Sequence, residues 1–219
     1  MSKAKIRVLV VDDHPIVRSG LSTEINLDPN MQVVGEAQDG VEAVAMALQL
    51  NPDVILMDLV MPEMDGIEAS AEIIQANPDA RILILTSFTE EEKIYAAIKA
   101  GASGYIFKDR RPDDVLQAIR DVHQGIPLLN PSITRRLARE LREQEHQQAE
   151  PVGNLTEREM EILKRVAQGA LYKEVALEIG VREATVRAHV SSILNKLGLS
   201  NRSQLVLYAI QHKLIETPG

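Results

Sequence analysis

Five short apolar runs, each followed by a segment of helical periodicity, occupy the first 125 residues of this 219-residue chain. The runs are rich in Val, Ile and Leu, a composition typical of parallel strands that are covered on both faces. We expect strands at residues 6–11, 32–37, 54–57, 81–85 and 105–107. Such a series of β-α units predicts an α/β fold with a doubly wound, five-stranded parallel sheet and helices on both of its faces.

The segments between these runs carry helix signals. Pro15 is tolerated in the first turn of a helix that continues to Leu27, and Asp39 to Glu42 has the form of a capping box. The expected helices cover residues 15–27, 39–50, 66–76, 90–100 and 112–124.

Polar side chains stand at the carboxyl ends of four predicted strands. Asp12 and Asp13 follow the first strand, Asp58 follows the third, and Thr86 and Lys108 follow the fourth and fifth. In an open parallel sheet, ligands bind outside the carboxyl ends of the strands, where the strand order reverses. Each side chain alone fits a cap, a turn or the surface, but together they predict a binding site at this edge.

The residue types at this edge indicate phosphoryl chemistry. Three carboxylates without His or Cys form a hard, oxygen-rich site that suits Mg²⁺. The ion would offset the charge repulsion that opposes attack by Asp58 on a phosphoryl donor, and an aspartate can accept phosphate in this way. Lys108 as a point charge and Thr86 as a hydroxyl donor would bind the phosphoryl oxygens.

These residues resemble the receiver domain of two-component response regulators. The resemblance covers residues 5–125 and is carried by Asp12-Asp13, by Asp58 with the Met-Pro-x-x-Asp-Gly sequence of residues 61–66, by Thr86 and by Lys108. It implies a flavodoxin-like receiver at residues 1–126, with a sensor histidine kinase as the phosphoryl donor and Asp58 as the acceptor.

The resemblance also implies roles for individual residues. Mg²⁺ would be held by Asp13, Asp58 and the carbonyl of Val60, with Asp12 acting through a metal-bound water. Thr86 and Tyr105 would form the switch pair that responds to phosphorylation; as an alternative, Tyr105 only packs against the fourth helix.

The composition changes after residue 126. Pro127, Asn130 and Pro131 break regular structure, so residues 127–152 are expected to form a linker, with a charged, helix-compatible part at residues 133–147. Residues 1–130 carry 11 Lys and Arg against 21 Asp and Glu, whereas residues 151–219 carry 9 against 7. An acidic first part and a mildly basic last part indicate two functions on one chain. The net charge of −8 argues against diffuse, charge-driven binding to nucleic acid.

Residues 153–219 predict a four-helix, all-α domain. Thr156 and Glu159 have the spacing of a capping box, and Ala176, Gly180 and Val186 fit the small, turn and inter-helix positions of a helix-turn-helix. The predicted helix at residues 183–197 has one apolar stripe and a neighbouring polar arc, formed by Arg187, Ala188, Ser191 and Asn195. This arc could face the major groove, with Arg187 reading guanine; an ordinary helical domain with a solvated face is the alternative.

The segment 153–215 is similar to the LuxR-type helix-turn-helix, and with the receiver it resembles the NarL/FixJ class of response regulators. The motifs are Leu155-Thr156-x-Arg158-Glu159, Lys173-Glu174-Val175-Ala176, Thr185-Val186-Arg187-x-His189-Val190 and Lys196-Leu197-Gly198. The predicted contacts to double-stranded DNA are Lys173, Thr185, Arg187, Ala188, Ser191, Lys196 and Arg202.

Two positions depart from this pattern. Tyr172 stands where the family usually has Asn, and Arg182 where it usually has a Ser or Thr cap. A lost N-cap costs about 1 kcal/mol, so these two helix starts depart from the phosphate contacts that the resemblance implies, although Arg182 could contact a phosphate itself.

We therefore predict a transcription regulator that is not an enzyme and that binds operator DNA as a homodimer once it is phosphorylated. The chain has no Cys and no apolar run of bilayer length, so we expect a cytoplasmic protein without a membrane partner. One rival is an enzyme, a flavodoxin-like hydrolase or phosphatase that uses Asp58 through a phospho-aspartyl intermediate. A phosphatase of the haloacid-dehalogenase type would require a second Asp at the position of Val60, which counts against this rival. A module that only dimerises is the other, and the five polar residues at the sheet edge argue against it. The kinase, the stimulus, the operator, the sign of regulation and the dimer face stay open.

Overall fold

The computed structural model of the chain describes residues 4–87, 91–137, 139, 155–199 and 201–215. It separates into two compact units, residues 1–123 and 124–219. In the described residues, no helix is long and apolar enough to cross a membrane.

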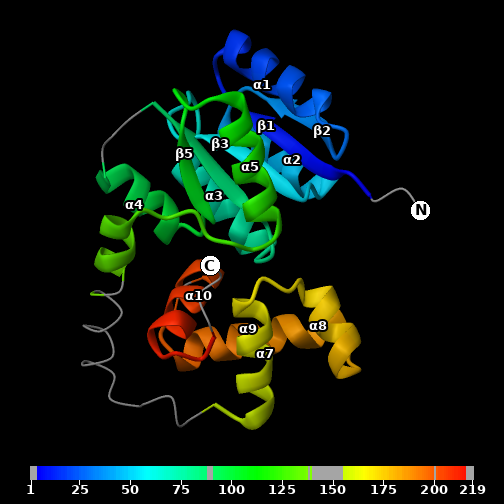
Figure 1. Ribbon diagram of the computed structural model, residues 1–219, viewed down its shortest axis with the longest axis vertical. Coiled ribbons are helices and arrows are strands. Elements are labelled where there is room, and N and C mark those ends of the chain that lie inside the picture. The colour runs from blue at the N-terminus through cyan, green and yellow to red at the C-terminus, as the bar shows by residue number, and fades with distance from the viewer. Residues whose placement is uncertain (1–3, 88–90, 138, 140–154, 200, 216–219) are drawn as a thin grey trace. The chain divides into compact units, whose positions relative to one another are not determined.

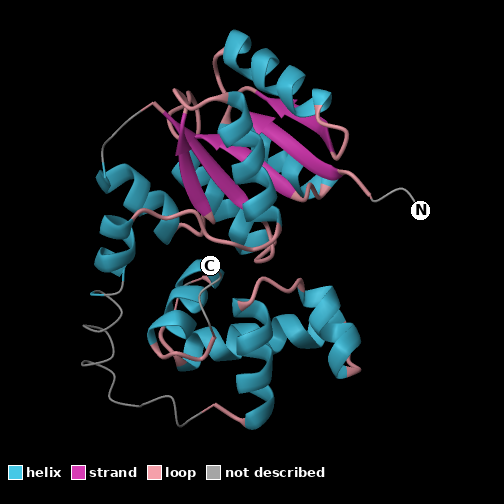
Figure 2. Ribbon diagram, viewed as in Figure 1, coloured by secondary structure: helices cyan, strands magenta, loops and turns pink. Residues whose placement is uncertain are grey.

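The first unit is built on a five-stranded parallel sheet with the strand order β2-β1-β3-β4-β5 (Figure 2). The strands are β1 (Ile6–Val11), β2 (Met31–Ala37), β3 (Val54–Asp58), β4 (Ile82–Thr86) and β5 (Gly104–Phe107). β1 pairs with both β2 and β3, so the strand order reverses at β1. The predicted α/β fold is thereby confirmed.

Five helices cover the two faces of this sheet (Figure 1). They are α1 (Pro15–Leu27), α2 (Gly40–Leu50), α3 (Gly66–Ala76), α4 (Glu91–Lys99) and α5 (Pro112–His123). α1 contacts α5 on one face, and α2 contacts α3, which contacts α4, on the other. β3 and β4 are buried along their whole length, as expected for runs that are apolar without interruption.

The strand boundaries differ slightly from the expected ones. β3 ends one residue later than predicted, because Asp58 continues the ladder and pairs with Leu85 of β4. β4 likewise runs to Thr86, which pairs with Phe107 of β5. Two polar residues of the predicted site therefore belong to the strands themselves, and the sheet fixes their backbone positions.

The second unit is helical, which confirms the predicted all-α second part. Its main helices are α7 (Glu157–Ala167), α8 (Tyr172–Ile179), α9 (Glu183–Lys196) and α10 (Arg202–Gln211). A further helical segment spans residues 131–137 and starts earlier than the expected 133, because the Asn130 side chain accepts a hydrogen bond from the Ile133 amide at 2.8 Å. Most of the expected linker helix, from residue 140 onward, lies outside the described residues.

The turn chemistry of the second unit follows the sequence. The Thr156 hydroxyl accepts from the Glu159 amide, and the Glu159 carboxylate accepts from the Thr156 amide, so the predicted capping box is present. Gly180 ends α8 in the left-handed region, with φ of 72°. Arg182 makes no side-chain cap at the start of α9, as its residue type predicts. Apolar side chains of all four main helices form one core.

Candidate functional site

The register between β1 and β3 sets the first two carboxylates side by side. Val11 pairs with Met57, so the next residues on the two strands are Asp12 and Asp58. Asp12 is fully buried and Asp58 is 4% exposed. They stand at the carboxyl end of the sheet where the strand order reverses, which is the position predicted for a ligand site.

Lys108 joins these two carboxylates. Its amine lies 2.6 Å from Asp12 Oδ2 and 2.8 Å from Asp58 Oδ2. The backbone amide of Lys108 donates to the Thr86 carbonyl at 2.9 Å, which continues the β4–β5 ladder and fixes the base of the side chain. The sheet thus brings Asp12, Asp58, Thr86 and Lys108 to one edge, as the sequence predicted.

The charges at this edge depend on one another. Burial raises the pKa of Asp58 above its usual value, and the hydrogen bond and positive charge of Lys108 offset this rise only in part. Burial alone would lower the pKa of Lys108, but its hydrogen bonds to Asp12 and Asp58 raise it overall. The amine is therefore cationic at neutral pH, and its charge favours the ionised form of Asp58, which is the form that attack by a carboxylate requires.

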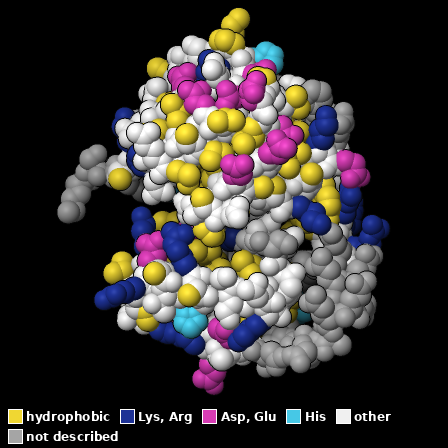
Figure 3. Space-filling view, turned by 180° about the vertical axis from the view of Figure 1, so that it is seen from behind, with side chains coloured by type: hydrophobic (Ala, Val, Ile, Leu, Met, Phe, Trp, Pro, Cys, Tyr) yellow, Lys and Arg dark blue, Asp and Glu magenta, His cyan; other side chains and the backbone are white. Residues whose placement is uncertain are grey.

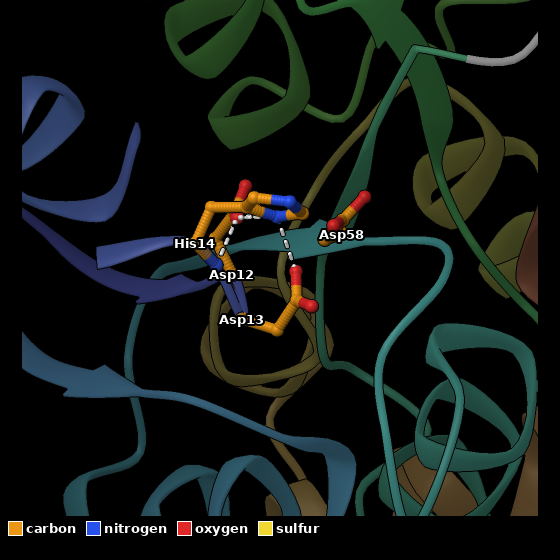
Figure 4. Close-up of side chains that lie close together, drawn as sticks. All are labelled: Asp12, Asp13, His14 and Asp58. Atoms are coloured by element: carbon orange, nitrogen blue, oxygen red, sulfur yellow. Dashed lines mark hydrogen bonds and ion pairs between the residues drawn. The ribbon is translucent and has the colours of Figure 1, made fainter. Parts of the chain in front are cut away.

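Asp13 and His14 complete the cluster (Figure 4). Ligand atoms of Asp12, Asp13, His14 and Asp58 all lie within 4.8 Å of one another. The His14 Nδ1 is 2.5 Å from Asp13 Oδ1, and the His14 side chain is 68% exposed. The sequence motifs predict a site without His; the position of His14 directly after Asp13 is the signal that could have placed it here.

The donor set fits a hard cation. Asp12, Asp13 and Asp58 offer carboxylate oxygens from two neighbouring strand ends, which are the ligands that Mg²⁺ prefers. Val60 lies two residues past Asp58 in the following loop and is 41% exposed. The role of its carbonyl stays a prediction.

The loop after Asp58 requires its glycine and its aspartate. Asp65 caps α3 by accepting from the amides of Ile67 and Glu68. A Cβ on Gly66 would lie only 2.1 Å from the Asp58 carbonyl oxygen, so no larger residue fits without moving the backbone of Asp58. Glu63 supplies the turn with a φ of 63°. The Asp-Gly pair thus holds the start of α3 against the end of β3.

The proposed switch residues lie on the neighbouring strands. Thr86 is fully buried at the end of β4. Tyr105 is half-buried on β5, and its ring meets that of Phe107 edge-on at a centroid distance of 5.5 Å. Their action as a pair stays a prediction.

In the second unit, α9 presents the predicted polar arc. Thr185, Ala188, Ser191 and Asn195 are exposed and Arg187 is partly exposed, whereas the apolar stripe faces the core. Lys173 is exposed on α8. On the face seen in Figure 3, acidic side chains gather over the sheet-containing unit, and Lys and Arg side chains are more frequent over the helical one.

Two residues that are predicted to contact DNA, Lys196 and Arg202, have partners inside the protein. The Lys196 amine lies 2.8 and 2.7 Å from the two carboxylate oxygens of Glu159, which is only 5% exposed. The Arg202 guanidinium donates to the carbonyls of Val166 and Ala170, at the end of α7. The sequence could not show these contacts, because they join residues more than 30 positions apart. Binding of either cation to a phosphate would compete with them.

The Glu159–Lys196 pair is also electrostatically strong. Hydrogen bonds from Lys196, together with those from Thr156 and Ser192, lower the pKa of Glu159 to about 2. One carboxylate thereby ties the start of α7 to the end of α9.

Both units match known protein families. Residues 8–120 match the response regulator receiver domain, and residues 153–209 match the LuxR family of bacterial regulatory proteins. The chain is 42% identical over 210 residues to the transcriptional regulatory protein LiaR of Bacillus subtilis (strain 168), a match that covers 96% of this chain and 99% of LiaR.

Solved structures resemble the chain over nearly its whole length. One is the response regulator ChrA of a heme-sensing two-component system, with 33% identity, a TM-score of 0.52, and coverage of 97% of this chain and 100% of ChrA. Another contains two RcsB dimers bound to two parallel DNAs, with 26% identity, a TM-score of 0.54, and coverage of 94% and 98%.

Proposed function

The chain belongs to the response regulators that join a receiver domain to a LuxR-type DNA-binding domain, and we propose that phosphorylation of Asp58 by a sensor histidine kinase turns it into a dimer that binds operator DNA. The observation that carries the proposal is the edge formed by Asp12, Asp58 and Lys108, on the same chain as a helix-turn-helix. Its family is one of transcription regulators, which leaves the phosphatase rival without support.

The phosphoryl transfer follows from the atoms of Asp58. Oδ1 accepts the Leu59 amide at 2.7 Å, and Oδ2 binds Lys108 at 2.8 Å. A carboxylate oxygen attacks the phosphorus of a phosphohistidine; a P–O bond forms, the P–N bond breaks, and the departing imidazole takes up a proton. Asp13, Asp58 and the Val60 carbonyl would hold Mg²⁺, with Asp12 acting through a metal-bound water, and the ion would supply positive charge beside the transferred group.

Lys108 and Thr86 would then serve the new phosphoryl group. In the free site the single charge of the Lys108 amine is shared between two carboxylates, and after transfer it has a dianionic group within the same reach. The Thr86 hydroxyl is the neighbouring donor on β4. Movement of the Lys108 and Thr86 side chains toward the phosphoryl oxygens would be the conformational change that transmits phosphorylation to the rest of the receiver.

The exposed arc of α9 supports the DNA-binding half of the proposal. A helix of 14 residues with Thr185, Arg187, Ala188 and Ser191 on one side has the size and the side chains to enter a major groove. Lys173 is exposed on α8, and we expect it to contact phosphates. The similarity to RcsB, whose structure has dimers on DNA, supports binding as a dimer.

Gel filtration and DNA binding, with and without a small phosphodonor plus Mg²⁺, test this function. We expect the phosphodonor to convert a monomer to a dimer and to raise the affinity for DNA. Asp58→Asn should abolish incorporation of acid-labile phosphate and both responses. Undiminished labelling of the Asn variant would show that Asp58 is not the acceptor.

A further inference from the structure

Tyr172 occupies an unusual position at the start of α8. It is 1% exposed and belongs to the core that the four main helices of the second unit share. Two guanidinium groups nevertheless lie over its ring. The Arg187 Cζ is 5.5 Å from the ring centroid and the Arg202 Cζ is 5.7 Å from it. Both distances are within the range of a cation–π contact.

The two arginines differ in what else holds them. Arg202 donates to the carbonyls of Val166 and Ala170, so its guanidinium is anchored to the end of α7. Arg187 projects from the polar arc of α9 and is paired with Glu183 on the same helix, with Nη2 at 2.7 Å from Oε1. Arg202 thus belongs to the framework, and Arg187 belongs to the surface proposed to meet DNA.

We propose that Tyr172 is a positioning residue for sequence recognition, because its ring orients the Arg187 guanidinium toward a base edge. The inference rests on the proposed function and adds one specificity-determining residue to it. An arginine on a solvated helix samples many rotamers, and ordering it on binding costs entropy. The Tyr172 ring and the Glu183 carboxylate restrict the rotamers of Arg187 before DNA binds, and this reduces the entropy cost.

The contact also explains why an aromatic residue suits this position. The face of a tyrosine ring carries negative potential that attracts a guanidinium, which an aliphatic side chain lacks. Asn, the usual residue of similar domains at this position, has no such face. Phe keeps the face and loses the hydroxyl, so it separates the ring's effect from that of the phenol.

The test uses the full-length chain with a small phosphodonor and Mg²⁺. Wild-type protein enriches a sequence from a pool of randomised 30-base-pair duplexes, and Kd is then measured for that duplex and for one of mixed sequence. We expect Tyr172→Phe to stay within twofold of wild type on both. Tyr172→Leu should lose about tenfold on the enriched duplex and less than twofold on the mixed one.

Base discrimination separates positioning from packing. Tyr172→Leu should lose preference at the same base pair as Arg187→Ala, and the double variant should bind no worse than Arg187→Ala alone. Tyr208→Leu is the matched control, because it removes a ring that is 3% exposed in the same unit and stacks on His212. Equal loss on both duplexes, or the same specific loss in Tyr208→Leu, would overturn the inference.

A second measurement does not depend on whether Tyr172→Leu folds. In NMR spectra of the wild-type chain, the side-chain Nε–H proton of Arg187 should be shifted by the ring current of Tyr172, and equally so in Tyr172→Phe. An unshifted signal would refute the contact. A wild-type chain that enriches no sequence would defeat the proposed function and this inference together, whereas enrichment with an indifferent Tyr172→Leu would defeat this inference alone.

Discussion

Charge pairing at single residues differs between the two units. At the sheet edge, the Lys108 amine is shared between the carboxylates of Asp12 and Asp58, which can each bind another partner in its place. In the second unit, the Lys196 amine is bound by both oxygens of the nearly buried Glu159 carboxylate. The first arrangement suits a reacting site. The second suits a structural tie, which makes Lys196 a poor candidate for a phosphate contact.

The Glu159 carboxylate should make the stability of the helical unit depend on pH. Its folded pKa of about 2 lies below the ordinary value of 4.5, so the ionised form stabilises the fold above pH 4.5, and this contribution is lost as pH falls toward 2. Glu159→Gln should lower the free energy of unfolding at pH 7 by about 1–3 kcal/mol. Urea unfolding followed by amide signals of α7 and α9 measures it.

The difference between wild type and Glu159→Gln should shrink below pH 4.5, as the wild-type carboxylate takes up its proton. A constant difference from pH 7 to pH 2.5 would contradict the assignment. Glu161→Gln is the control, since the Glu161 carboxylate is half-exposed and pairs with Arg158 on the same helix.

Arg187 and Lys173 should differ in how their loss affects DNA binding. Arg187→Ala should cost about 1–3 kcal/mol on the cognate duplex, because a bidentate base contact is lost. Lys173→Ala should weaken all sequences alike and reduce the slope of log K against log salt by about 1. DNA titrations of both variants at several salt concentrations measure these effects. An equal loss of affinity for cognate and random DNA in Arg187→Ala would rule out base readout by Arg187.

Val60 should lengthen the lifetime of the phosphorylated state. Hydrolysis of an aspartyl phosphate needs a water in line with the bond, and an apolar side chain two residues past Asp58 cannot orient one. Val60→Glu should speed phosphate loss about tenfold, which corresponds to about 1.4 kcal/mol of barrier. Decay of labelled phosphoprotein gives the rate, with Val60→Leu as the apolar control. Unchanged or slower loss in Val60→Glu would refute the role. The same expectation for Phe88 falls on a residue outside the described part.

At the scale of elements, the site depends on how closely α3 approaches β3. Two glycines give a matched comparison. A Cβ added to Gly66 would clash with the Asp58 carbonyl oxygen, whereas a Cβ added to Gly20 of α1 would meet nothing within 4 Å. The first is needed for a close approach, and the second only loosens its helix.

Gly66→Ala should therefore impair phosphorylation, because its Cβ displaces the backbone that carries the Asp58 side chain. Gly20→Ala should phosphorylate normally and stabilise the fold by about 0.5–1 kcal/mol. Initial rates of labelling by a small phosphodonor and thermal unfolding of both variants provide the comparison. Normal labelling of Gly66→Ala would show that the loop yields without cost.

For the whole molecule, charge is divided between the two parts. Residues 1–130 carry 11 basic against 21 acidic side chains, a net charge of −10, and residues 151–219 carry 9 against 7, a net charge of +2. Opposite net charges on a tethered pair allow the acidic part to compete with DNA for basic side chains, at modest strength in physiological salt.

Residues 150–219 alone should then bind DNA at least as well as the unphosphorylated full chain. The fragment retains the core of the four main helices, which consists of residues between 155 and 215. Affinities measured side by side at one salt concentration test this, with a circular dichroism spectrum of the fragment as the control for folding. A fragment that binds clearly worse would mean that the receiver assists by dimerising and does not inhibit.

The local and periodic features of this protein could be predicted from its sequence. Uninterrupted apolar runs predicted the strands, Asp39 and Thr156 marked helix starts, and polar residues at strand ends predicted a single site, because residues at the carboxyl ends of parallel strands share one edge. Asp39 does accept from the Glu42 amide, and Lys108 does reach Asp12 and Asp58.

Which Lys and Arg side chains have partners inside the protein, and which face the solvent, could be seen only in the tertiary structure. Lys196 pairs with Glu159, 37 residues away, and Tyr172 lies under arginines from two other helices. No periodicity encodes such contacts, since they depend on how helices cross after the core has formed. His14 likewise lies beside the carboxylates because the turn after β1 places its ring next to Asp13.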